Sequence, residues 1–485
     1  MERRILEEAG FPPIDFEGWR KLAEKTLKGG DFTSLISHTD DGIEIEPLHA
    51  RSTNAKALFS RPQGRWLSLQ RTDDPDPERA RQQIAEDVDG GANGISFVFE
   101  GAPNAAGYGL PAEPEIFARL LDGIPIDALH LRIDPHPGSR ASADWLAEYL
   151  VRRRADASRL SLSLGIDPAT TLAATGRLRM TVEALRASLP QSLAGFFAHG
   201  LPGVILEADG RAYHNGGASE AQELGAVLSA AVGHLRLFED ARQPLVYAVG
   251  HIGFALAVDQ DQFVSIAKLR ALRKLWARVQ EACGTEPAET IIHAETSWRM
   301  MTALDPETNI LRATIAAFAA AVGGADSVSV LPHTLPLGLP DASARRLARN
   351  MQLILADESH VGAVADPGAG SGGIEALTER LCEAGWEEFR QLEAEGGVMQ
   401  SLVDGRLQRR IATARKARLA RVADGRRKII GTTLYPLKEE RPAHFLDARR
   451  GQVREDGAVL CEPLPRLRID EGIAAPVDLE GRHRQ

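Results

Sequence analysis

A histidine at position 214 is the side chain of this sequence best suited to act on a bound molecule. It lies in residues 213–218, which read Tyr-His-Asn-Gly-Gly-Ala and come shortly after an apolar run that predicts a β-strand. An imidazole at such a place can donate a hydrogen bond to a carbonyl oxygen and polarise it, and the two glycines let the backbone approach a ligand closely. The other interpretation is a histidine whose hydrogen bonds are satisfied within its own loop.

Polar and cationic side chains also follow three later strand-like runs. Residues 250–253 read Gly-His-Ile-Gly, residues 296–299 read Thr-Ser-Trp-Arg, and residues 332–334 read Pro-His-Thr. Such groups could contact a carbonyl or phosphate oxygen, or they could equally cap a helix or make a structural hydrogen bond. The candidate side chains for a substrate-facing rim are Tyr213, His214, Arg299 and His333.

These candidates need a scaffold that brings strand ends together. From residue 65 to residue 334, short apolar runs alternate with stretches whose apolar residues recur every three or four positions, as in helices packed on a sheet. The predicted strands are residues 65–70, 94–100, 128–134, 160–167, 203–208, 244–250, 291–297 and 327–332. The predicted helices between them include residues 76–87, 142–154, 219–237, 261–279 and 309–322. Repeated strand–helix units with short connections indicate a parallel sheet.

Eight such units fit a (β/α)₈ (TIM) barrel, an α/β fold that places functional groups at the C-terminal ends of its strands. A doubly wound open sheet is the structural alternative. The even spacing of the units favours the barrel, and so does the lack of a Gly-x-Gly-x-x-Gly loop after the first strand. On this prediction His214 lies at the C-terminal mouth of the barrel.

The regions before and after the predicted barrel lack its regular alternation of strands and helices. Residues 16–27 predict a helix, residues 402–422 predict a strongly basic helix that faces solvent or a partner, and residues 428–437 predict one β-segment. The end of the chain is charged, contains prolines and has no periodicity, which is typical of an irregular tail that can wrap a partner. The expected parts are an N-terminal extension (1–60), the barrel (61–340), a mainly helical region completing the barrel domain (341–437) and the tail (438–485).

The composition is that of a soluble acidic protein. The 485 residues carry a net charge of -10 with a pI near 5.8, which argues against general nucleic-acid binding. The three cysteines lie far apart without a Cys-x-x-Cys pair, which argues against a zinc site or a disulfide framework and favours a reducing compartment. We find no secretory signal and no apolar run long enough to cross a bilayer. These observations predict a cytoplasmic protein without nucleic-acid, membrane or metal partners.

Four stretches together resemble one protein family, in the order that the family has them. Residues 212–224 resemble its Gly-Tyr-His…Gln-Glu-Leu segment, and residues 263–276 resemble its Glu-Ile-Ala-Lys-x-Arg-Ala-x-Arg-x-Leu-Trp helix. Residues 304–309 are similar to its Gln-Asp-Pro-Tyr-Asn-Asn turn, and residues 358–378 to its Glu-Ser…Asp-Pro-Ala-Ala-Gly-Ser loop. The family is the adenosylcobalamin-dependent acyl-CoA mutases, of which methylmalonyl-CoA mutase is the best known. The resemblance covers residues 60–435 and implies a (β/α)₈ barrel followed by a cobalamin-binding domain.

The sequence departs from the catalytic members at the positions that the family uses for chemistry. Residues 56–66 lack the family's tyrosine, no arginine upstream of Tyr213 matches the one that pairs with the substrate carboxylate, and residues 333–338 lack the acid that meets the adenosyl ribose. Residues 134–138 approximate the cobalamin motif Asp-x-His-x-x-Gly but are one residue short, and we expect no flavodoxin-like cobalamin-binding domain. Of the catalytic set, only His214 is kept.

The resemblance therefore implies the small (beta), non-catalytic subunit of a heterodimeric methylmalonyl-CoA mutase. Such a chain binds no cofactor itself, stabilises a large catalytic subunit, and leaves adenosylcobalamin to the holoenzyme. Two alternatives stay open: a catalytic barrel whose cobalamin-binding domain is a separate chain, and a stand-alone barrel that binds a coenzyme A thioester. An open bore lined by serine and threonine would favour the last, whereas bulky inward side chains would favour the subunit. Strand alternation alone does not fix which face points inward.

Overall fold

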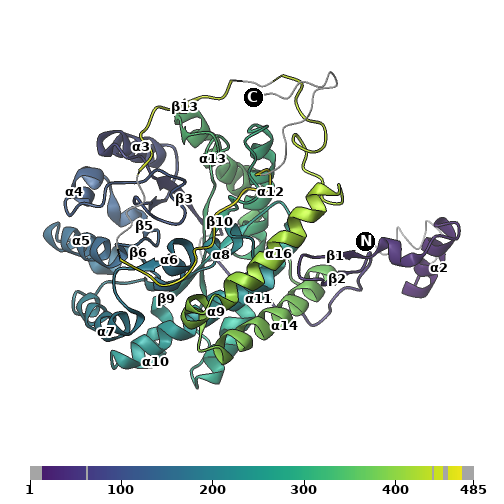
Figure 1. Ribbon diagram of the computed structural model, residues 1–485, viewed down its shortest axis with the longest axis horizontal. Helices are drawn as coiled ribbons and strands as arrows, with labels where there is room; N and C mark the ends of the chain where they lie inside the picture. Colours follow the sequence, from purple (N-terminus) through teal and green to yellow (C-terminus); the bar gives the residue numbers. More distant parts are fainter. Residues whose placement is uncertain (1–13, 62–63, 440–441, 452–456, 472–485) are drawn as a thin grey trace.

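Eight parallel strands close into a barrel at the centre of the molecule (Figure 1). The computed structural model describes residues 14–61, 64–439, 442–451 and 457–471. The barrel strands are β3 (Leu67–Thr72), β4 (Gly94–Phe97), β5 (His130–Ile133), β6 (Ser161–Ile166), β8 (Val204–Asp209), β9 (Ile252–Val258), β10 (Ile291–Thr296) and β11 (Ser327–Ser329). Each pairs with the next in this order, and β11 pairs with β3 to complete the ring. The predicted (β/α)₈ barrel is confirmed, and the open sheet is excluded.

Helices surround the barrel and bury their apolar faces against the strands. They are α3 (Pro77–Asp89), α4 (Ile116–Leu121), α5 (Ser139–Arg152), α6 (Pro168–Thr175), α7 (Val182–Ala198), α9 (Glu220–Asp240), α11 (Gln262–Ala282) and α12 (Thr308–Gly323). Trp276 of α11, for example, meets Phe254 of β9 edge to face, with ring centroids 5.2 Å apart. Asp76, Asp167 and Asp261 accept hydrogen bonds from the first free N–H groups of α3, α6 and α11, which fixes where these helices begin.

The sixth strand is predicted too early in the chain: the strand begins at Ile252, just after the predicted range. Residues 244–250 form the short helix α10 (Leu245–Ala248) and part of a 3₁₀ turn, and the strand is β9 after it. Two apolar runs follow one another in the sequence here, and only their burial shows which one is the strand. Every residue of β9 is buried, whereas Val246 and Tyr247 are 64% and 68% exposed. His251 therefore lies at the N-terminal end of the barrel, where its Nδ1 is 2.7 Å from the carbonyl oxygen of Gly203. It does not belong to the rim.

In the described part of the chain after the barrel, the α-helices are α13 (Ala342–Leu353), α14 (Gly372–Ala394), α15 (Val398–Val403) and α16 (Arg406–Ala423). α14 packs along α9 and α11 and so adds a second helical layer on one side. The β-segment predicted at residues 428–437 is wrong, because the N–H groups of Thr432, Thr433 and Leu434 all bond to the carbonyl oxygen of Ile429 and close a turn. Within the described ranges no helix has the length and apolar character needed to cross a bilayer.

The N-terminal arm, residues 14–61, consists of α2 (Phe16–Thr26) and a hairpin of β1 (Ser37–His38) and β2 (Glu44–Ile45). α2 extends away from the barrel (Figure 1), and none of its residues is buried. Asp40, at the tip of the hairpin, accepts hydrogen bonds from Arg418, Arg421 and Arg427. Part of the basic helix α16 therefore holds the arm rather than facing solvent.

We expect the docking of the arm to weaken as the pH falls below 4. Burial opposes ionisation of Asp40, but Arg418 and Arg427 outweigh it and lower its pKa from 3.8 to about 2. Because the folded pKa lies below the unfolded one, this stabilisation is complete above the unfolded value of 3.8 and is lost as the pH falls through 2. A shift of this size corresponds to roughly 2 kcal/mol.

Cleavage of the arm by pepsin, which works across this range, measures the effect. Asp40→Asn should make the arm sensitive at every pH and remove the pH dependence, whereas Glu17→Gln, at an exposed position of α2, should behave like the unaltered chain. Equal cleavage of the unaltered chain at pH 4 and pH 2 would contradict the assignment.

The C-terminal segment, residues 457–471, crosses the mouth of the barrel, where Figure 1 shows it as a yellow trace over α6 and the mouth helix α8 (Arg211–Asn215). It begins with β14 (Ala458–Val459), which pairs with β7 (Arg177–Leu178). Further along, its N–H groups bond to the rim: Leu464 to Ala173 at 2.7 Å, Leu467 to Asn215 at 3.1 Å and Ile469 to Arg299 at 2.9 Å. The described part of the tail thus contacts its own barrel.

Candidate functional site at the barrel mouth

His214 lies at the C-terminal mouth, as predicted, but it is turned inward. It belongs to α8, directly after β8, and its side chain is fully buried. Its Nδ1 is 3.2 Å from a carboxylate oxygen of Glu223, and its Nε2 is 2.9 Å from the hydroxyl of Ser297. Both ring nitrogens therefore have partners within the chain, and the imidazole has no free position for a ligand carbonyl.

A buried cluster of charges holds this histidine. Lys268 of α11 donates to Glu220 and Glu223, and Arg299 donates to Glu220 at 3.0 Å and to Asp259 at 3.3 Å. Burial would raise the pKa of Glu220, but Lys268, His214 and Arg299 hold it well below its usual range. His214, Glu220 and Asp259 have ligand atoms within 4.8 Å of one another, a spacing that suits a metal ion. Lys268 and Arg299 already supply the positive charge that such a cation would bring.

A second network fills the bore. Arg132 of β5 grips Glu207 of β8 with two hydrogen bonds, one of them 2.7 Å long, and Arg71 of β3 bonds to Glu295 of β10 at 3.0 Å. One other strand separates the members of each pair around the ring, so the side chains must meet inside the barrel. Arg211 joins the two pairs. The inner part of the network consists of Arg71, Arg132, Arg211, Asp73, Asp134, Glu207, Asp209 and Glu295, each with at most 4% of its side chain exposed. Arg345 of α13 extends it through an ion pair with Asp73 at 3.9 Å.

The bore is therefore a packed, charged core and not an open channel. Serines are present on inward positions, such as Ser96, which donates to Asp134, but the long arginine side chains occupy the space between the strands. Buried ion pairs of this kind require that every charge keep its partner, since an unpaired buried charge is costly. A thioester arm threaded through the barrel would have to displace them.

The predicted rim residues do not all come together. Tyr213, His214 and Arg299 are neighbours under the C-terminal segment, and Arg299 also donates to the backbone oxygens of His214 and Ala218. Burial raises the pKa of Tyr213 well above its ordinary value. His333 instead lines a separate cavity of about 450 Å³ beside Phe445, with none of the other three in its walls. Burial lowers the pKa of His333.

Comparison with known proteins shows which family this chain belongs to. Residues 113–462 match the family model described as methylmalonyl-CoA mutase. The chain belongs to this family. It is 36% identical to the methylmalonyl-CoA mutase small subunit of Streptomyces virginiae over 98% of this chain and 77% of that protein. The corresponding small subunit of Propionibacterium freudenreichii is 30% identical over 91% of this chain and 72% of its own length. The probable small subunit of Mycobacterium bovis is 40% identical over 67% of this chain, and the match spans about half (52%) of that relative.

Some of the buried charges could have been found from the sequence, and others could not. Arg132 and Glu207 alternate with apolar residues in strands, and a charged position in a strand covered by helices must point into the bore. Lys268 lies in the segment 263–276 that carries the family resemblance, yet only the fold shows that it meets two glutamates. Asp259 carries no signal of its own beyond its place at the end of a strand.

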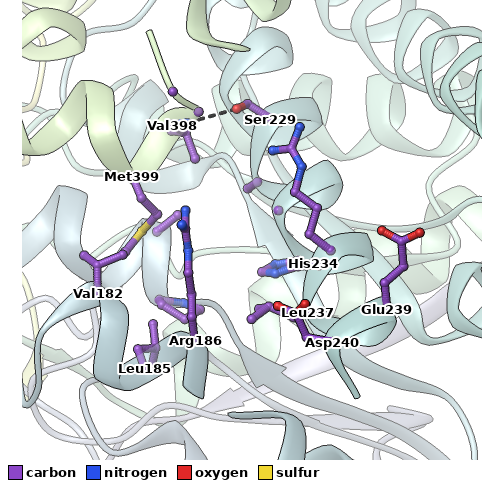
Figure 2. A pocket seen from close by; sticks show the side chains of 17 residues that line it. Val182, Leu185, Arg186, Ser229, His234, Leu237, Glu239, Asp240, Val398 and Met399 are labelled. Atoms are coloured by element: carbon purple, nitrogen blue, oxygen red, sulfur yellow. Dashed lines mark hydrogen bonds between the residues drawn. The ribbon is translucent and has the colours of Figure 1, made fainter. Parts of the chain in front are cut away.

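A further cavity of about 480 Å³ lies outside the barrel between α7 and α9 (Figure 2). Met399 forms part of an apolar side, Arg186 extends along the middle, and Glu239 and Asp240 bring opposing charge. His234 borders it and places Nε2 2.9 Å from a backbone oxygen of β8. None of the predicted rim residues lines this cavity.

Proposed function

We propose that this chain is the small, non-catalytic subunit of a heterodimeric, adenosylcobalamin-dependent methylmalonyl-CoA mutase. In the assembled enzyme, a large subunit would bind cofactor and substrate and interconvert methylmalonyl-CoA and succinyl-CoA. The observation that carries the proposal is the closed barrel: an ion network fills its bore and the C-terminal segment covers its mouth. The small-subunit relatives reported above support the same assignment.

The mouth does not suit the cofactor. A cobalamin that docked there would meet residues 460–470 before it reached the strands, and the histidine kept from the catalytic set has both nitrogens engaged. Radical chemistry on a cofactor needs a protein that orients it and excludes water. We therefore assign no step of the reaction to this chain and place adenosylcobalamin on the large subunit.

The contribution of this chain to the enzyme would then be a surface that packs against the large subunit and stabilises it. α2 presents an apolar side to solvent, with Ile14 before it 59% exposed and Phe16 and Leu22 at 46% and 51%. α2 meets residues 32–35 through Trp19 and Phe32, whose ring centroids are 6.1 Å apart. An amphipathic helix that still exposes apolar side chains in the described structure is suited to pack on another subunit. We assign the N-terminal arm to the surface of the large subunit, which it would stabilise in the cytoplasm.

Mutase activity with adenosylcobalamin tests the proposal. The chain is assayed alone, with its co-expressed large subunit, and with an isolated cobalamin-binding domain. We expect turnover only with the large subunit. His214→Ala should leave the specific activity of the purified heterodimer within twofold, because this residue contacts no substrate in the proposal.

The two alternatives predict different results. Turnover with the isolated cobalamin-binding domain, abolished by His214→Ala, would make this barrel the catalyst of a split mutase. Tight binding of a coenzyme A thioester by the chain alone would make it a stand-alone acyl-CoA-binding barrel. Either result would overturn the assignment as a non-catalytic subunit.

A further inference from the structure

A cavity of about 450 Å³ lies at the edge of the barrel mouth, beneath the C-terminal segment. Residues 101–108, which follow β4, form one wall, and the ends of α6 and α8 form another. Residues 463–466 of the C-terminal segment, together with Gly451, form the rest of the described lining. Its volume falls in the range of small-molecule sites, about 300–1,000 Å³.

Two buried amides on the lining have unused donors. Asn215 is 3% exposed; its Oδ1 accepts from the N–H of Arg299 at 3.2 Å, but within the described chain its Nδ2 bonds to no residue. Asn104 is 4% exposed, and its Nδ2 likewise has no hydrogen-bond partner among the described residues. A buried donor without an acceptor, such as Nδ2 of Asn104, costs about 1–3 kcal/mol, so an acceptor brought by a ligand would relieve an existing penalty at Asn104.

The third donor is the guanidinium of Arg466. Its Cζ lies 3.8 Å from the centre of the Trp298 ring, and its one hydrogen bond to a described residue, 3.4 Å long, goes to the carbonyl oxygen of Pro103. No carboxylate of the described chain forms an ion pair with it. Burial and the nearby Arg71 lower the pKa of Arg466 to about 9, which fits a cation whose charge is poorly compensated.

The described lining combines one cationic side chain and a few neutral polar side chains with a larger number of apolar residues. Among the residues that the structure describes, Arg466 is the single charged residue on the lining, and none of the described aspartates or glutamates lines the cavity. The apolar members are mostly small: Ala102, Ala105, Ala106, Ala174, Ala212, Pro463, Leu464 and Pro465. Amide and guanidinium donors suit a carboxylate, which accepts through two oxygens, and the alanines leave room for a short hydrocarbon body.

We propose that this cavity binds a small aliphatic carboxylate, with its carboxylate on Arg466 and the two asparagine amides. The site exists only when the C-terminal segment lies over the mouth, since that segment supplies Arg466. Binding would therefore hold the segment closed. The proposal goes beyond the subunit role and does not depend on it.

Calorimetric titration of the full-length chain with butyrate tests the site. We expect butyrate to bind at least tenfold more tightly than butyramide, which lacks the charge, and than inorganic phosphate, which lacks the aliphatic body. Arg466→Gln should weaken butyrate binding at least tenfold. Arg468→Gln is the matched control, because Arg468 lies in the same segment and pairs with Asp470 but does not line the cavity.

A second variant separates loss of the site from loosening of the segment. Ala174→Leu adds bulk to the cavity lining on α6 and leaves Arg466 in place, so it should also abolish butyrate binding. Absence of butyrate binding to the unaltered chain would overturn the proposal. So would binding that survives both Arg466→Gln and Ala174→Leu, or phosphate binding tighter than butyrate.

Discussion

Replacing Arg132 with methionine will destabilise the chain by about 3–5 kcal/mol, the range for breaking a buried ion pair. Arg132 donates twice to Glu207 and once, at 3.1 Å, to Asp134, and all three side chains are at most 2% exposed. Removing the guanidinium leaves Glu207 without its cation in the middle of the barrel. Urea unfolding of the purified chain measures the change in free energy.

Two comparisons isolate the cause of that loss. Arg152→Met removes an exposed pair with Glu148 at 3.0 Å and should change the free energy of unfolding far less than Arg132→Met does, because solvent screens such pairs. The double variant Arg132→Met with Glu207→Leu removes both charges and should recover much of the lost stability. If Arg132→Met alone cost no more than the surface variant, the bore would be hydrated, and the argument that the barrel is closed to a thioester would fail.

Gly165→Ala should prevent stable folding of the barrel, at a cost of several kcal/mol. Gly165 of β6 has φ 58°, in the left-handed region, and lies where the pairing of β6 with β8 shifts register. A Cβ here would overlap the carbonyl oxygen of Ile133 on β5. Both the strained backbone and the collision with a rigid strand oppose alanine. Soluble yield and the urea midpoint report the effect.

Gly233→Ala is the matched control. Gly233 lies inside α9, and a Cβ added there meets no atom within 4 Å. Alanine is the better helix former by up to about 1 kcal/mol, so this variant should unfold at the same or a higher urea concentration. Equal stability of the two variants would show that the barrel can shift at β6, against the geometry described above.

The order of elements could be predicted from sequence because it depends on local patterns. Alternating apolar runs and helical periodicity found seven of the eight strands, at the places that the structure has them. The sixth failed because residues 244–250 and residues 252–258 are both apolar, and period alone does not separate a short exposed helix from a buried strand. Burial against neighbouring strands decided it, and burial is a property of the whole fold.

The sequence by itself also determined the family and the position of His214 at the mouth, since strand ends meet at one face of a parallel barrel. Only the tertiary structure decided what that histidine does. Its partner Ser297 is 83 residues away along the chain, and Arg132 meets Glu207 across 75 residues. The sequence of the C-terminal segment has no periodic pattern that predicts its position. It binds the rim largely through backbone N–H groups, which are present whatever the side chains are. Linear patterns record which faces are apolar, whereas the pairing of buried charges and the closure of the mouth depend on contacts between distant residues.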